Sequence, residues 1–437
     1  MHFSVILFVL SLIICSKIST QAQSLVRNYV GDLEADMTVP QIIRHWGYPA
    51  EIHKVTTADG YVLELHRIPR GINELDSNRR RPVVFLQHGL LCTSSVWVMN
   101  LPHQSAGFMF ADAGFDVWLG NMRGNSYSRG HVKKNIRRSA YWSFSWDHMA
   151  KYDLEAMIDY VLNATKRDRL YYVGHSQGTL TMFSKLSLND GFSKKIEKFF
   201  AIAPVGTITY VKGLFRYLGE RMYEQLLVFT AIFGDQEFLP NTIISRWLTE
   251  FVCGLYTTNP LCENFLFLTR IGIYLAHNPA GTSIRNILHY CQMVRQHRQQ
   301  AYDYGKEGNL RNYGKISAQE YDISRIQSVP IHLFYSDSDW LATSQDVEKH
   351  LLRRIDRRLL AGVHKLDDFN HNDFLWGLRA AQEVYMPIID EIRRGESDGM
   401  WLNRRQNGRL ETTTPGTIGF KLAPLTGEDG DLIYIKT

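Results

Sequence analysis

A serine held between two glycines is the feature of this sequence most suited to chemistry. Ser176 lies in the run Gly174-His175-Ser176-Gln177-Gly178, between an apolar, β-favouring stretch at 170–173 and apolar residues at helical spacing over 179–186. A strand-to-helix turn exposes a serine hydroxyl, and glycines beside it make room for the tight backbone. The first amides of the following helix then suit a developing oxyanion. The stretch predicts a nucleophilic Ser176.

The same pattern occurs a second time, in Gly395-Glu396-Ser397-Asp398-Gly399. This copy lies in a charged run, with no strand pattern before it and no apolar helix pattern after it. We interpret it as a chance match in a solvated tail.

A serine nucleophile needs a histidine base and an acid that orients the base. In α/β hydrolases these follow in the order serine, acid, histidine. Two acids, Asp337 and Asp339, follow an apolar run at 329–335, and the candidate histidines His364 and His371 come later. The residue order alone leaves both choices open.

A second glycine-containing turn follows the apolar run at 82–87, in His88-Gly89-Leu90-Leu91. Its position matches the loop that supplies the second oxyanion donor, so the backbone amides of Leu90 and Gln177 are the predicted pair. No HExxH, paired CxxC or P-loop pattern occurs, so the sequence implies neither a metal nor a cofactor.

Strand and helix patterns alternate around these residues. Apolar runs at 82–87, 115–119, 170–173, 199–203 and 329–335 predict buried strands, and residues 51–67 predict a hairpin around Asp59-Gly60. Residues 39–48 and 149–162 predict helices. The alternation predicts an α/β fold with a mostly parallel central sheet flanked by helices on both faces.

One stretch, 205–324, has helical patterns and no clear strand. It fits an ordinary helical subdomain, or a cap whose inner face binds an acyl chain, and one insertion can do both. The predicted domains are a core of 23–204 and 325–394, the helical cap 205–324, and a polar, disordered tail 395–437.

The N-terminus has the pattern of a signal peptide over residues 1–22, with an apolar stretch at 3–15 and the small-x-small site Thr20-Gln21-Ala22. The region before the apolar stretch lacks Lys and Arg, so a membrane anchor at the N-terminus is the lesser alternative. No later stretch reaches 18 uninterrupted apolar residues, so no transmembrane anchor is expected. We expect a protein of the secretory pathway, either secreted or lysosomal. The sequon at Asn163 predicts glycosylation.

The net charge and the cysteines give further expectations about binding partners and disulfides. The net charge of +5 is small for 437 residues, and the one dense basic cluster, 133–138, fits a solvated face better than a nucleic-acid site. Removing the signal peptide leaves Cys92, Cys253, Cys262 and Cys291. Cys253 and Cys262 are favoured as a disulfide because they close a small loop, although three complete pairings are possible.

Several blocks of the sequence resemble the acid lipase family, the gastric and lysosomal acid lipases and their invertebrate relatives. The resemblance runs from about Trp46 to Tyr385. It rests on Thr57-Ala58-Asp59-Gly60-Tyr61, His88-Gly89-Leu90-Leu91, Asp116-Val117-Trp118-Leu119-Gly120-Asn121, Tyr152-Asp153-Leu154, Gly174-His175-Ser176-Gln177-Gly178 and Phe233-Gly234-Asp235.

The resemblance implies a choice among the open alternatives. Asp339-Trp340-Leu341-Ala342 matches the acid motif of the family, and Asn370-His371 with Asp373-Phe374 matches its histidine motif. It also implies the Cys253–Cys262 disulfide, a cap with a lid, and triacylglycerol or cholesteryl ester substrates. Cys92, Cys291 and the polar tail depart from the family pattern.

The expected function is therefore that of a lipase acting on lipid esters at a lipid–water interface. Ser176, His371 and Asp339 are its predicted triad. The alternatives are an esterase or acyltransferase for shorter or different acyl donors, and a lipid carrier without turnover. The sequence leaves the oligomeric state open.

Overall fold

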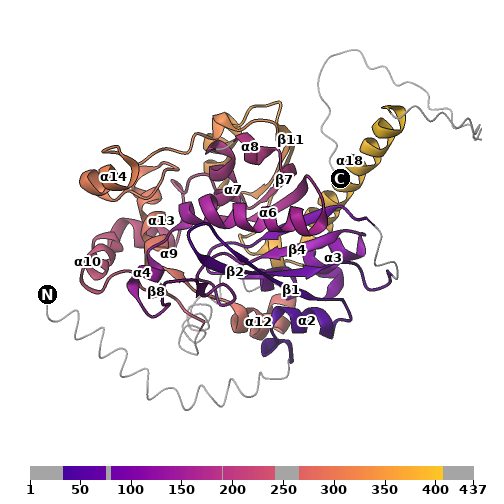
Figure 1. Ribbon diagram of the computed structural model, residues 1–437, viewed down its shortest axis with the longest axis horizontal. Coiled ribbons are helices and arrows are strands. Elements are labelled where there is room, and N and C mark those ends of the chain that lie inside the picture. The colour runs from indigo at the N-terminus through magenta and orange to yellow at the C-terminus, as the bar shows by residue number, and fades with distance from the viewer. Residues whose placement is uncertain (1–32, 75–79, 189, 242–264, 407–437) are drawn as a thin grey trace, which may run out of the picture. The chain divides into compact units, whose positions relative to one another are not determined.

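Figure 1 presents the protein as a computed structural model. It divides into two units at the bond between Ile392 and Arg393, and each is described by itself. The structure describes residues 33–74, 80–188, 190–241 and 265–406.

The predicted apolar runs form the centre of one sheet. Its parallel strands are β3 (Val83–Gln87), β4 (Asp116–Gly120), β6 (Leu170–His175), β7 (Ile196–Ile202) and β10 (Ile331–Ser336). Almost every residue of these strands is buried, as expected where helices cover both faces. The spatial order β4-β3-β6-β7-β10 brings the carboxyl ends of β3, β6 and β10 to one edge.

The predicted hairpin continues this sheet. Strands β1 (Glu51–Thr56) and β2 (Tyr61–Ile68) pair antiparallel, β2 pairs with β4, and the two-residue strand β5 (Gly130–His131) pairs with β2. The sequence analysis did not predict one further strand, β11 (Leu360–Leu366). It pairs parallel with β10 and is the last strand of the sheet on the side opposite β1. None of its residues is fully buried, so it lacks the continuous apolar run that marks the central strands.

Helices cover both faces of the sheet. They include α2 (Val39–His45), α3 (Ala106–Asp112), α6 (Leu154–Thr165), α7 (Gln177–Leu188) and residues 386–392 of α18 (Met386–Gln406). Figure 1 shows α6 lying across the sheet. The helix predicted at 149–162 begins as a π-helical turn at Met149–Asp153 and continues as α6.

Shorter helices and turns complete this part of the chain. They are Leu33–Ala35, Ser94–Trp97, Pro102–Gln104, Ser139–Trp142 (α4), Trp146–His148 (α5), Asp190–Ser193 (α8), Ile323–Arg325, Ser344–Asp346 (α15), Val347–Leu351, Leu352–Arg354 (α16), Asp373–Trp376 (α17) and Ala381–Tyr385.

The stretch between β7 and β10 is mostly helical, as predicted. Its described helices are α9 (Leu214–Tyr217), the π-helical turn Leu218–Met222, α10 (Tyr223–Phe233), α12 (Phe265–His277), α13 (Ile284–Gln296) and α14 (Gly305–Tyr313). Four of them, α9, α10, α13 and α14, gather at the left of Figure 1.

The absence of strands from this stretch was a wrong prediction. Strand β8 (Glu237–Phe238) pairs antiparallel with β9 (Thr282–Ser283). Two-residue strands carry no alternating pattern, and partners 44 and 46 residues apart give no hairpin signal.

The prediction of a disordered tail over 395–437 was also wrong for the first part of that range, because α18 continues to Gln406. Arg, Glu, Met and Leu favour a helix, and no proline occurs between Pro387, in the first turn of α18, and Pro415. The second glycine-serine-glycine pattern, 395–399, lies inside this helix and not on a strand-to-helix turn. Residues 407–437 lie outside the described residues.

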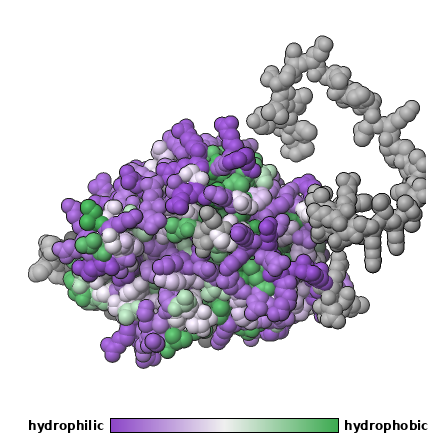
Figure 2. All heavy atoms as spheres, turned by 45° about the horizontal axis from the view of Figure 1, so that its top comes forward, coloured by the Kyte–Doolittle hydropathy of each residue, from purple (hydrophilic) through white to green (hydrophobic). Residues whose placement is uncertain are grey.

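The surface in Figure 2 carries both hydrophilic and apolar side chains. The face in Figure 2 is hydrophilic over most of its area, with apolar side chains in separate small groups. No helix among the described residues is long and apolar enough to cross a membrane. The predicted signal peptide, 1–22, lies outside the described residues.

Candidate active site

Ser176 lies on the sharp turn between β6 and α7. Its backbone φ of 53° is left-handed, an uncommon and strained conformation for a residue with a side chain. Gly178 permits the turn, since a Cβ there would lie 2.5 Å from the carbonyl oxygen of Gln87 in β3. The turn therefore holds the serine at the carboxyl edge of the sheet.

Three predicted residues meet at this edge. The Nε2 atom of His371 lies 2.8 Å from the Ser176 Oγ, and its Nδ1 atom lies 2.9 Å from Oδ2 of Asp339. A carboxylate can only accept, so Nδ1–H donates to Asp339 and Nε2 accepts from the serine hydroxyl. The histidine is thus oriented to remove the serine proton.

Asp339 is buried and held by more than the histidine. Its Oδ1 accepts the backbone amides of Leu341 at 2.8 Å and Ala342 at 3.0 Å. Burial alone would raise the pKa of this carboxyl, but the charge and hydrogen bond of His371 and the two amides lower it below its usual value. Asp339 therefore stays ionised beside the histidine.

The other two candidates lie elsewhere. Asp337 is largely exposed and forms an ion pair with Lys365 at 3.0 Å. His364 lies in β11, where its ring stacks on Phe334 at 4.2 Å. Only Asp339 and His371 reach Ser176 as a hydrogen-bonded chain.

The loop after β3 is fixed against the serine. Burial lowers the pKa of His88 to about 4, so the ring is neutral. Its Nδ1–H donates to the Gly89 carbonyl at 2.8 Å, and its Nε2 accepts the amide of Met122 at 3.2 Å. A Cβ on Gly89 would lie 3.0 Å from the Ser176 Cβ. The loop therefore brings Leu90 close to the reaction centre.

Gln177, the second predicted oxyanion donor, is the first residue of α7. The first amides of a helix have no carbonyl partner within that helix. The Gln177 amide is thus one of the N–H groups at the end of α7 that adjoins Ser176.

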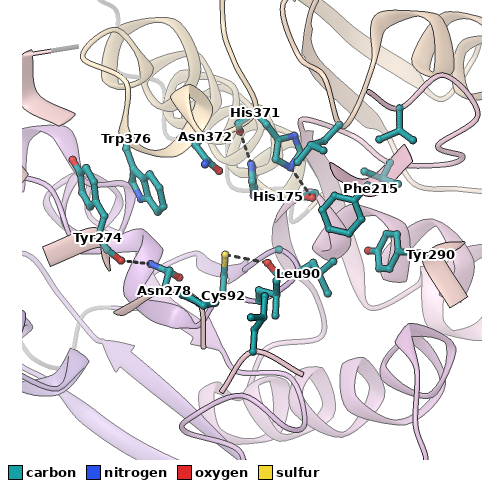
Figure 3. A pocket seen from close by; sticks show the side chains of 18 of the residues that line it. Leu90, Cys92, His175, Phe215, Tyr274, Asn278, Tyr290, His371, Asn372 and Trp376 are labelled. Carbon is teal, nitrogen blue, oxygen red and sulfur yellow. Dashed lines mark hydrogen bonds between the residues drawn. The ribbon is translucent and has the colours of Figure 1, made fainter. Parts of the chain in front are cut away.

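A cavity of about 340 Å³ opens onto these residues. Figure 3 shows His371, Leu90, Cys92 and Phe215 around it. At one end Tyr274 stacks on Trp376, with ring centroids 4.6 Å apart. Besides Tyr274 and Trp376, the apolar lining residues are Leu90, Leu91, Val205, Ile208, Val211, Phe215, Leu239, Leu275, Pro279, Tyr290 and Leu341.

Comparisons with known proteins agree with this architecture. The sequence matches the family descriptions "Partial alpha/beta-hydrolase lipase region" over residues 39–101 and "alpha/beta hydrolase fold" over residues 82–233. It is 51% identical to Lipase lipl-5 of Caenorhabditis elegans, over 82% of this chain and 93% of that protein. Gastric triacylglycerol lipases of Bos taurus (43%) and Homo sapiens (42%) match over 82% and 83% of this chain, and 91% and 92% of theirs.

The chain belongs to the acid lipase family. This confirms the resemblance read from the sequence, and with it the α/β-hydrolase fold and the assignment to the serine ester hydrolases.

One histidine of this acid lipase site was missed by the sequence analysis. His175, directly before Ser176, donates from Nε2 to the backbone carbonyl of His371 at 3.0 Å (Figure 3). Burial and the neighbouring His371 lower its pKa to about 3, so it is a neutral donor. This hydrogen bond connects the loop that carries His371 to the turn that carries Ser176. In the sequence, the position directly before the serine is the only signal that could have indicated a role for His175.

The two cysteines that depart from the family pattern are both thiols. Cys92 lines the cavity and donates to the Leu90 carbonyl at 3.4 Å, and burial raises its pKa to about 12. Cys291 is buried in α13. The predicted Cys253–Cys262 disulfide lies outside the described residues. No cluster that could hold a metal ion occurs among the described residues.

A second group of serine, histidine and aspartate lies where α5 and the residue before it meet α13. The Ser145 Oγ lies 2.5 Å from Oδ1 of Asp147 and 3.1 Å from Nδ1 of His289. Asp147 also accepts the Tyr302 amide at 3.0 Å. Trp146 stacks on His289 at 4.2 Å. No sequence motif marks this cluster, because its members come from distant segments.

Proposed function

We propose that this chain is a lipase that hydrolyses carboxylic ester bonds of neutral lipids through an acyl-enzyme on Ser176. The observation that carries the proposal is the hydrogen-bonded chain Ser176–His371–Asp339, which adjoins an apolar cavity. A nucleophile, a base and an orienting acid are what ester cleavage requires, and the cavity supplies an apolar environment for an acyl chain.

In the first step, the Ser176 Oγ attacks the ester carbonyl carbon while its proton passes to Nε2 of His371. The carbonyl oxygen becomes an oxyanion, which accepts hydrogen bonds from the amides of Leu90 and Gln177. The carbon–oxygen bond to the alcohol then breaks, and the departing oxygen takes the proton from His371. The acyl group remains on the serine.

In the second step, a water molecule attacks the acyl-serine carbonyl and gives one proton to His371. The bond to Ser176 breaks, its oxygen recovers that proton, and the fatty acid leaves. Asp339 stabilises the imidazolium form of His371 in both steps.

Neutral lipids are the proposed substrates for two reasons. The printed names of two relatives, at 43% and 42% identity, are gastric triacylglycerol lipase. The cavity wall is largely apolar, and residues 205–324 supply much of it, including Val211, Phe215 and Leu275. We propose that this stretch is a cap that binds the acyl chain.

An apolar outer surface supports action at a lipid–water interface. On α10, Val228, Ile232 and Phe233 are 58%, 68% and 59% exposed. Residues four apart share one face of a helix, so the solvent face of α10 is apolar in its last two turns, whereas its first turn exposes Glu224 and Gln225. Exposed apolar groups of this kind mark interaction surfaces.

We also propose that the protein enters the secretory pathway, which would make it secreted or lysosomal. The apolar segment and small-x-small site within residues 1–22 support this route. Asn163, the predicted glycosylation site, is exposed in the last turn of α6.

The test is fatty-acid release from emulsified long-chain triacylglycerol and cholesteryl ester between about pH 4 and pH 8. A short soluble ester is assayed in parallel, and Ser176→Ala protein is the blank. Release of long-chain fatty acid that the substitution abolishes is the expected result.

Two other outcomes would contradict the proposal. Turnover of the short ester alone indicates an esterase. No turnover by folded protein, with lipid binding and no labelling by a fluorophosphonate, indicates a carrier.

A further inference from the structure

The side chain of Gln177 connects the nucleophile turn to the helical insertion. Gln177 is buried, and its Oε1 accepts hydrogen bonds from the Asn286 amide at 2.9 Å and the Tyr290 hydroxyl at 3.2 Å. Both partners belong to α13. The first residue of α7 is thus held by a helix that lies 109 residues later in the chain.

Asn286 is itself held in one orientation. Its Oδ1 accepts the backbone amide of Trp146 at 2.8 Å, and its Nδ2 donates to Gln177 and to Thr282 Oγ1 at 3.0 Å. A backbone N–H can only donate, so Trp146 must face the oxygen of Asn286 and Gln177 must face the nitrogen. Asn286 is fully buried, so no water competes for these bonds.

This arrangement fixes the part of α7 whose amide serves the reaction. Oxyanion donors act only when they lie within about 2.7–3.1 Å of the charged oxygen, so small displacements are costly. The backbone amide of Gln177 is the proposed oxyanion donor, and the side chain of the same residue is bonded to Asn286. Tyr290, its other partner, lines the substrate cavity near Phe215 (Figure 3).

We propose that Asn286 is a positioning residue for ester hydrolysis, which holds Gln177 so that its backbone amide meets the oxyanion. This inference rests on the proposed function. Asn286 touches no reacting atom and acts through Gln177. Its loss weakens binding of the transition state and leaves binding of the ground-state ester unchanged.

The direct test is Asn286→Leu, which keeps the volume and removes the hydrogen bonds. For a short soluble ester, kcat falls about tenfold to a hundredfold, while KM stays within about twofold. The affinity for a trifluoromethyl ketone, which forms a tetrahedral adduct on the serine, falls by the same factor as kcat/KM. A kcat equal to wild type in folded protein overturns the proposal.

Asn309 provides a matched control in the same insertion. It is also buried, accepts the Tyr304 amide at 2.9 Å, and donates to Asp303 at 2.7 Å and to the Ile316 carbonyl at 3.2 Å. Asn309→Leu removes an equal number of hydrogen bonds away from Gln177. It lowers thermal stability and leaves kcat unchanged. An equal loss of kcat in both variants indicates general damage to the insertion and overturns the positioning role.

Gln177→Met tests the same contact from the other side, and it decides the question if Asn286→Leu does not fold. Methionine keeps the length of the side chain and the backbone amide, but it offers no Oε1 acceptor. The kcat falls with KM unchanged, as for Asn286→Leu. In the double variant the two losses do not multiply, because both remove one contact. Losses that multiply show that Asn286 acts elsewhere.

The two proposals fail in different ways. Wild-type protein without ester hydrolysis, or Ser176→Ala protein as active as wild type, overturns the proposed function. Hydrolysis that depends on Ser176, together with wild-type kcat in Gln177→Met and Asn286→Leu, overturns only the positioning role.

Discussion

Two clusters of this molecule contain the same three residue types and differ in how the bonds are ordered. In one, His371 lies between Ser176 at 2.8 Å and Asp339 at 2.9 Å. In the other, the Ser145 hydroxyl lies 2.5 Å from Asp147 and donates to it directly. The Ser145 proton therefore points to Asp147 and away from His289, and the other ring nitrogen of His289 donates to the Gln300 carbonyl instead of to an orienting acid.

The two clusters also differ in access. Ser176 and His371 line the cavity, whereas Ser145 and His289 are fully buried. The buried cluster joins two segments instead, because Asp147 accepts the Tyr302 amide and His289 donates to the Gln300 carbonyl at 2.8 Å. Residue types alone therefore do not define a site. The order of the bonds and the access to solvent do.

The largest expected contrast comes from replacing the aspartate in each cluster. Asp339→Asn lowers kcat about 10⁴-fold, because the amide no longer holds His371 in the tautomer that accepts the serine proton. Asp147→Asn keeps kcat per folded molecule within about twofold and lowers the free energy of unfolding by about 3 kcal/mol. The measurements are kcat for a soluble ester and urea unfolding. Equal kcat losses in the two variants would show that the buried cluster takes part in the reaction.

The sequence could predict the first cluster because its residues carry local patterns. Ser176 stands between an apolar strand and a helix, and the runs around Asp339 and His371 match motifs of the acid lipase family. The central strands were predicted for a similar reason, since continuous burial produces continuous apolar runs. The residue order alone did not separate Asp339 from Asp337, and the structure places only Asp339 beside His371.

The second cluster and Asn286 could not be predicted, because no local pattern specifies their partners. His289 meets Ser145 across 144 residues, and Asn286 meets Gln177 across 109. The β8–β9 ribbon depends on a similar long-range pairing. The first two contacts arise only when the insertion packs on the core, and the ribbon forms only when two distant parts of the insertion meet. The sequence of one segment therefore does not indicate its partner.

The next largest effect concerns how stability depends on pH. Burial lowers the pKa of His289 from its usual 6.5 to about 4. The unfolded chain binds a proton in this range and the folded chain does not, so His289 costs stability as pH falls from 6.5 to 4. The cost reaches about 3 kcal/mol at the lower end. His289→Gln removes it, so the unfolding free energy of the variant falls less steeply with acid.

Urea unfolding of wild type and His289→Gln at a series of pH values measures this directly. The slope of the unfolding free energy against pH should differ between the two proteins by the equivalent of up to one bound proton in the range between the two pKa values of His289. Above that range the slopes should coincide. Parallel curves across the whole range would show that His289 titrates in the folded protein as it does in the unfolded chain.

A smaller effect is expected from the serine of the buried cluster. Ser145→Ala removes its hydrogen bonds and lowers the free energy of unfolding by about 1–2 kcal/mol. The kcat stays at the wild-type value, since Ser145 is not accessible to substrate. A fluorophosphonate labels the Ser145→Ala protein fully and the Ser176→Ala protein not at all. Residual label on the latter would mean that Ser145 is a nucleophile.

The smallest effect is expected for a third candidate nucleophile, the thiol of Cys92. It lines the cavity near Ser176, as an active nucleophile would, but burial raises its pKa to about 12. The thiolate is the reactive form, so iodoacetamide at neutral pH reacts with Cys92 in the native protein far more slowly than in urea. Cys92→Ala should leave kcat within about twofold, because the thiol donates only a weak bond to the Leu90 carbonyl. Rapid alkylation with loss of activity would show that position in the cavity confers reactivity without a base. Slow alkylation would strengthen the contrast with Ser176, which differs in having His371 at hydrogen-bond distance.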